Sequence, residues 1–147
     1  MSIALLTGQC AKSLCYDYSS NPSRPAHLTI EEEYKLSEFV AKGTVLSEQK
    51  ISSTDDPIGY EATLYTIKIS KVFKGIIKSK LTIRSENTSS RFPMNIGRSY
   101  IIFVKKDNND DLFIDNCGNS GETKKSHAII QKVLTLNSDN KNGNKRH

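Results

Sequence analysis

The stretch YEATLYTIKISKVF at residues 60–73 constrains the fold more than any other part of the sequence. Tyr65, Ile67 and Ile69 alternate with polar residues, which is the pattern of a β-strand with one buried face. The alternation then slips by one residue, and this slip predicts a β-bulge near Ser70 and Lys71. Because this is the strongest strand signal in the chain, we expect a mainly β protein.

Four more segments have strand patterns: residues 39–49, 80–85, 99–106 and 112–117. Gly43 predicts a bulge or bend within the first of them. A helix is predicted from TIEEEYKLSEF, where Thr29 and Glu32 have the spacing of a capping box. The run of Glu31, Glu32 and Glu33 is interpreted as a solvated first turn that the helix dipole favours, not as a metal site. A second amphipathic helix is predicted over residues 123–136, with Ile129 and Val133 on its buried side and Lys124, Lys125 and Lys132 exposed.

Five strands, one helix before them and one after them predict a five-stranded antiparallel barrel of the OB type. A sandwich usually needs about seven strands, more than this chain offers. The length of 147 residues fits one domain, which we assign to residues 14–136. Residues 137–147 are polar and are expected to form a disordered tail.

The N-terminus has features of a signal peptide. The apolar run IALLTGQC is followed by AKS, whose small residues fit cleavage after Ser13, so residues 1–13 are predicted to be a signal whose start lies upstream of Met1. We therefore expect export to the periplasm or the extracellular space. The alternatives are an N-terminus that is not cleaved and a lipoprotein signal at Cys10, although Gln9 before it is not a small residue. No apolar run reaches the ~18 residues of a spanning helix.

The chain has three cysteines, Cys10, Cys15 and Cys117. Cleavage after Ser13 would remove Cys10 and leave two cysteines in a compartment that permits disulfides. Catalytic and zinc-binding roles are the alternatives, but the three histidines form no nucleophile pattern, and the cysteine spacing is not that of a zinc site. The acids and amides of DNNDD, residues 107–111, lack the spacing of an EF-hand calcium loop. The sequence therefore predicts no metal, no cofactor and no enzyme.

Three segments together resemble the tissue inhibitors of metalloproteinases. They are FVAKGTV in the first strand, YTIKISKVFKG at residues 65–75, and IGRSYIIFVKKDNNDDLFIDNC at residues 96–117. In this order they point to the netrin-like OB domain, and in particular to inhibitor-like proteins of bacteria. The resemblance covers most of the chain from Cys15 to Leu136.

The resemblance implies an exported protein-binding module that inhibits metalloendopeptidases through its N-terminal arm. In the family, the free amine and carbonyl of a first cysteine chelate the zinc of the protease. Here Cys15 and Cys117 match a second cysteine and its disulfide partner, whereas Ser13 stands at the first position and SSRFPMNIG lacks the matching cysteine. The implied disulfide is Cys15–Cys117. The residues implied to contact a zinc metalloprotease are Leu14, Cys15, Tyr16, Asp17 and Tyr18.

The second functional hypothesis is an OB-fold module that binds single-stranded nucleic acid or another ligand. The formal charge of +5 and the pI of about 9.1 are compatible with it. Such modules need exposed aromatic side chains on which bases stack. The aromatic residues of the strands alternate with polar residues and are expected to be core instead: Tyr60, Tyr65, Phe73, Tyr100 and Phe103. Nucleic acid is therefore the less favoured partner.

Overall fold

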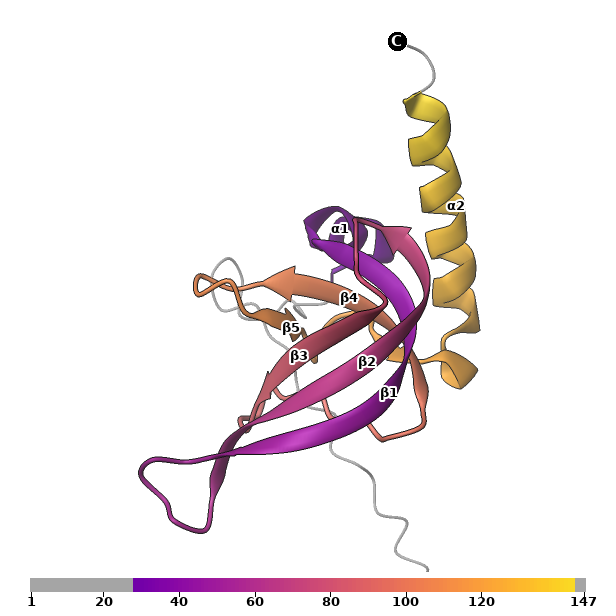
Figure 1. Ribbon diagram of the computed structural model, residues 1–147. Helices are drawn as coiled ribbons and strands as arrows, with labels where there is room; N and C mark the ends of the chain where they lie inside the picture. Colours follow the sequence, from indigo (N-terminus) through magenta and orange to yellow (C-terminus); the bar gives the residue numbers. More distant parts are fainter. Residues whose placement is uncertain (1–27, 145–147) are drawn as a thin grey trace, which may run out of the picture.

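The computed structural model describes residues 28–144 (Figure 1). Its elements in chain order are α1 (Ile30–Leu36), β1 (Phe39–Ser52), β2 (Tyr60–Lys74), β3 (Lys80–Glu86), β4 (Ser99–Lys106), β5 (Leu112–Ile114), β6 (Gly121–Glu122), a 3-10 helix η1 (Thr123–Lys125) and α2 (His127–Gly143). The expectation of a mainly β protein with one helix before the strands and one after them is confirmed.

All strands belong to one antiparallel sheet with the order β3-β2-β1-β4-β5, and the short β6 pairs with β4. Within residues 28–144 no hydrogen-bonded ladder joins β3 to β5, although the two strands lie close together. The sheet is therefore open, and the predicted closure into a barrel is not found. The short length of β5 explains this result, because three residues offer little backbone for a ladder on a second edge.

The long β1–β2 ladder contains the predicted bulge. Lys42 lies opposite Lys71 and Gly43 lies opposite Ile69, so Ser70 is an extra residue on β2. A bulge of this kind bends its strand and increases the local twist. Figure 1 shows β1 and β2 as two long, strongly curved strands that run side by side.

The sheet buries a cluster of side chains on each face. The first cluster lies on the face away from the two helices and includes Ala41, Val45, Tyr65, Ile67, Ile83, Tyr100, Ile102 and Val104. The second lies under the two helices and includes Tyr34, Val40, Phe73, Ile101, Phe103 and Val133. Four of the five aromatic residues expected in the core are thus buried, and Tyr60 is half-buried.

Both ends of α1 are fixed by side chains. At its start the predicted capping box is confirmed, because Thr29 Oγ1 accepts from the Glu32 amide at 3.1 Å and Glu32 Oε2 accepts from the Thr29 amide at 2.9 Å. At its end Lys74 of β2 donates to the carbonyl oxygens of Tyr34 and Lys35, each at 2.8 Å, and also to that of Ser37. A short helix is therefore tied to the sheet through its last carbonyl groups.

The second helix differs from the prediction at both ends. A 3-10 turn occupies Thr123–Lys125, and α2 then runs to Gly143, so residues 137–143 are helical and not part of a disordered tail. The predicted face is confirmed, since Val133 is buried and Ile129 partly so, while Lys124, Lys125 and Lys132 are exposed. Among the described residues no helix is both long and apolar enough to cross a membrane.

Candidate functional site

The five residues predicted to contact a protease, Leu14 to Tyr18, lie outside the described residues, as does Cys15. The described body begins at Leu28, which directly precedes α1. Cys117 lies within the body and is disulfide-bonded. Its partner is outside the described residues, so its pairing with Cys15 stays a prediction. Leu28 and Cys117 are the two described positions nearest to this predicted site.

Cys117 lies in the turn between β5 and β6, residues 115–120, called here the Cys117 turn. The Asp115 side chain accepts a hydrogen bond from the Cys117 amide at 2.9 Å, and the Asp115 carbonyl accepts one from the Gly118 amide at 3.1 Å. An aspartate that bonds the amide two residues ahead starts a turn. This explains why β5 ends at Ile114, whereas the sequence predicted a strand that continues to Cys117.

The carboxylate of Glu33 lies inside the Cys117 turn. Glu33 projects from α1 and is 0% exposed. Its Oε2 accepts from the Asn119 amide at 2.6 Å and from Asn119 Nδ2 at 2.7 Å. A Cβ atom at Gly118 would overlap the same carboxylate, so only glycine lets the turn pass this close. The turn is shaped around a side chain that lies 86 residues earlier in the sequence.

Asn119 also reaches the point where the N-terminal segment enters the body. Its Nδ2 donates to the Leu28 carbonyl at 3.1 Å as well as to Glu33. One asparagine therefore connects Leu28, Glu33 and the turn that carries Cys117. Leu28, the first described residue, and the turn that carries the disulfide-bonded Cys117 therefore share a single hydrogen-bond network.

The charges around Glu33 do not balance. Lys105 of β4 donates to Asp115 at 3.2 Å and lies 3.9 Å from Glu33 Oε1, so one ammonium faces two carboxylates. Within the described part of the protein, Oε1 accepts no hydrogen bond. Burial raises the pKa of Glu33 above its ordinary value, and the charge of Asp115 adds to this, although the bonds from Asn119 and the charge of Lys105 act in the opposite direction.

The interpretation of the three acids as a solvated first turn is wrong for Glu33. Glu31 and Glu32 are exposed, as predicted, but Glu33 is buried together with Tyr34. Helical spacing gave a partial indication that Glu33 is buried, because Glu33 lies one turn from Ile30 and one turn from Ser37. Ile30 is partly buried and Ser37 is fully buried. The sequence did not show the partner that makes burial of a carboxylate tolerable, since Asn119 is distant along the chain.

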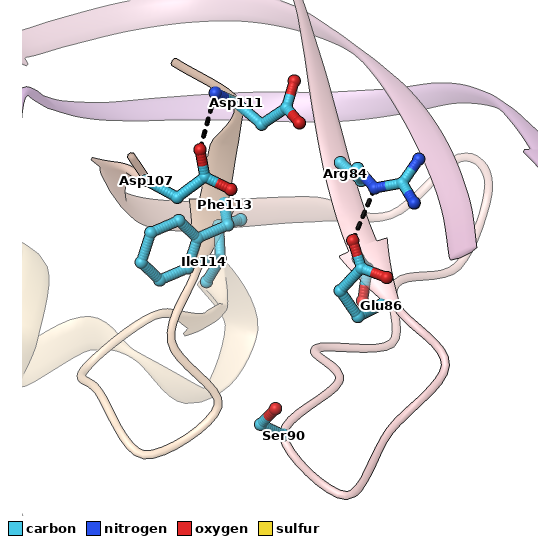
Figure 2. A pocket seen from close by; sticks show the side chains of 8 residues that line it. Arg84, Glu86, Ser90, Asp107, Asp111, Phe113 and Ile114 are labelled. Atoms are coloured by element: carbon cyan, nitrogen blue, oxygen red, sulfur yellow. Dashed lines mark hydrogen bonds and ion pairs between the residues drawn. The ribbon is translucent and has the colours of Figure 1, made fainter. Parts of the chain in front are cut away.

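A small cavity of about 230 Å³ lies between β3 and the β4–β5 hairpin, where the sheet is open (Figure 2). Its rim carries Arg84, Glu86, Asp107 and Asp111, and its apolar wall is formed by Phe113 and Ile114. Arg84 already pairs with Glu86 and Glu61, and Asp107 accepts hydrogen bonds from the amides of Asn109 and Asp111. Internal partners thus account for Arg84, Glu86 and Asp107, so the cavity does not indicate a ligand class.

In the hairpin loop DNNDD, the first aspartate has a structural role. Asp107 Oδ1 accepts from the Asn109 amide at 2.8 Å and from the Asp111 amide at 3.0 Å, which fixes the turn. Asp110 has a positive φ of 64°, a conformation that aspartate adopts more readily than most residues. In residues 28–144 no group of three or more His, Cys, Asp or Glu side chains is arranged to hold a metal ion.

Comparison with protein-family models and with curated proteins gave no match for this sequence. The resemblance to the metalloproteinase inhibitors therefore rests on the three sequence segments described above, and it remains a prediction.

Proposed function

We propose that the protein is an exported protein-binding module of the netrin-like OB type, and that its N-terminal arm binds and inhibits a zinc metalloendopeptidase. The observation that supports this proposal is the hydrogen-bond network shared by Leu28 and the Cys117 turn. Leu28, where the arm enters, and Cys117, which is disulfide-bonded, are joined through Asn119. A pairing of Cys117 with Cys15 would hold residues 15–28 as a loop against the body and would present Leu14 to Tyr18 beside it.

The strand order is compatible with an OB-type barrel. The sheet runs from β3 through β2, β1 and β4 to β5, and β3 and β5 lie close to each other without a ladder. An OB fold is a partly open five-stranded barrel. In this interpretation, the gap between β3 and β5 is the open seam of the barrel.

The chemistry of the arm would be metal chelation at the active site of the partner. The zinc belongs to the protease, and the arm would offer a free α-amine and a carbonyl oxygen in place of the water that zinc activates. Cleavage after Ser13 would make Leu14 the first residue. The absence of a second disulfide at Ser13 leaves the tip less fixed, and ordering it on binding would reduce affinity. We therefore expect weak or no inhibition of animal-type matrix proteases.

The experiment compares chains that begin at Met1, Ser13 and Leu14 in an assay with a zinc endopeptidase. Only the chain that begins at Leu14 should inhibit well, because thirteen additional residues would block the amine and even one would displace it. Equal inhibition by all three chains would exclude the amine from the mechanism. No inhibition by any chain would refute the proposal of protease inhibition.

The nucleic-acid alternative receives less support from the fold. Tyr65, Phe73, Tyr100 and Phe103 are at most 5% exposed, so their rings cannot stack on bases. A gel shift with single-stranded DNA at increasing salt tests this alternative, because binding through phosphates weakens steeply as salt rises. A complex that is stable at low salt and lost at high salt would favour the alternative.

A further inference from the structure

Burial of the Glu33 carboxylate costs free energy, because the group loses its hydration. It is fully buried, one of its oxygens lacks a hydrogen bond within the described part of the protein, and the nearest cation, Lys105, is shared with Asp115. A buried carboxylate with incomplete partners destabilises a fold unless its remaining contacts offset the loss of hydration. Both hydrogen bonds that the Glu33 side chain accepts within the described residues come from Asn119, in the turn that carries Cys117.

We propose that Glu33 is the positioning residue of the N-terminal arm, because through Asn119 it holds both the Leu28 carbonyl and the Cys117 turn in place. The inference deepens the proposed function, and it rests on that function only for its consequence in inhibition. How firmly the arm is anchored is a property of this chain alone and can be measured without a protease.

The geometry separates this role from that of an ordinary core residue. Asn119 uses its backbone amide and its side chain on the same Glu33 oxygen, which fixes the orientation of the turn at that position. Gly118 packs against the carboxylate, so the turn cannot move inward. Asp115 accepts from the Cys117 amide and is itself bonded to Lys105. Lys105 thus links the carboxylate that binds the Cys117 amide to the carboxylate that binds Asn119.

Among residues 28–144, the surrounding elements do not offer Glu33 another strong partner. The charged groups that face it are Lys105 from β4 and Asp115 from the turn. On α2, Lys132 pairs at 2.6 Å with Glu31, which is exposed. The contact with the turn is therefore the principal interaction of the Glu33 side chain.

Anchoring of this kind has a measurable consequence for the disulfide. Interactions that hold Cys117 and Leu28 in place raise the effective concentration of the two thiols, which determines how reducing a mixture the disulfide survives. The full chain is equilibrated in glutathione mixtures, free thiols are alkylated, and the peptide that contains Cys117 is quantified by mass spectrometry. The readout follows Cys117 itself, whichever cysteine is its partner.

The variants are Glu33→Ala, Glu33→Gln, Asn119→Ala and the control Ile67→Val, a core change on β2. In Glu33→Ala the disulfide should become half-reduced in a mixture about tenfold less reducing than for the natural chain, since two hydrogen bonds to a charged acceptor are lost. Asn119→Ala should shift it in the same direction. Glu33→Gln keeps an oxygen for Asn119 and should stay within about threefold, and Ile67→Val within about twofold.

Circular dichroism first establishes that each variant is folded. If Glu33→Ala and Asn119→Ala behave like the natural chain, the inference is overturned. It is also overturned if Ile67→Val shifts the disulfide as much as they do, because the effect would then reflect general stability. Absence of protease inhibition by the natural chain would refute the proposed function and would leave this test of Glu33 intact.

Discussion

Replacement of Lys74 by methionine should destabilise the protein by removing the cap on the last turn of α1. The Lys74 ammonium donates to the carbonyl oxygens of Tyr34, Lys35 and Ser37. Methionine has a similar length and apolar stem, but it cannot donate. The sequence resemblance includes this lysine in YTIKISKVFKG, and the structure assigns it a role inside the protein.

The change in the free energy of unfolding depends on the three hydrogen bonds that are lost and on whether water can replace them. A hydrogen bond with a charged partner contributes about 1.5–3 kcal/mol when its loss leaves a buried group unsatisfied. The bond to exposed Lys35 would be replaced by water, whereas Tyr34 and Ser37 are buried. Burial also lowers the pKa of Lys74, which shows that holding the ammonium there has a cost. We therefore expect a net loss of about 1–3 kcal/mol, or a fall in Tm of about 4–12 °C.

The assay is urea unfolding followed by circular dichroism, with Lys68→Met as the matched control. Lys68 lies on the same strand and is exposed. The control should change the free energy of unfolding by less than about 0.5 kcal/mol. Equal stability of the two variants would refute the capping argument, and a larger loss in Lys68→Met would show that charge on the sheet face matters more than the cap.

Three further predictions concern α1 and the Cys117 turn. Because the pKa of Glu33 is raised, the stabilisation that comes from its bound proton should be fully present below about pH 4.5 and lost as pH rises through the folded pKa, while the hydrogen bonds from Asn119 remain; subtracting the pH profile of Glu33→Gln from that of the natural chain should show this fall, and a flat difference would contradict it. Gly118→Ala should destabilise by about 1–3 kcal/mol through overlap with Glu33, and a double-mutant cycle with Glu33→Ala should show strong coupling; additive effects would exclude the contact. Thr29→Ala should cost about 1 kcal/mol and speed amide exchange at Glu32, whereas unchanged exchange would count against the capping box.

Local patterns in the sequence determined the secondary structure. The alternation of Tyr65, Ile67 and Ile69 predicted β2, and the slip after it predicted the bulge at Ser70. The spacing of Thr29 and Glu32 predicted the start of α1. These features depend on residues within a few positions of one another, so the sequence contains all the information they need.

The tertiary structure decided the features that depend on distant partners. The bonds between Glu33 and Asn119 turned an acid expected in solvent into a buried one, and the turn at Asp115 ended β5 before Cys117. The short β5 in turn left the sheet open next to β3. A side chain shows its own polarity in the sequence, but the free energy of burying it depends on the groups that surround it, and here those groups come from a turn 86 residues away.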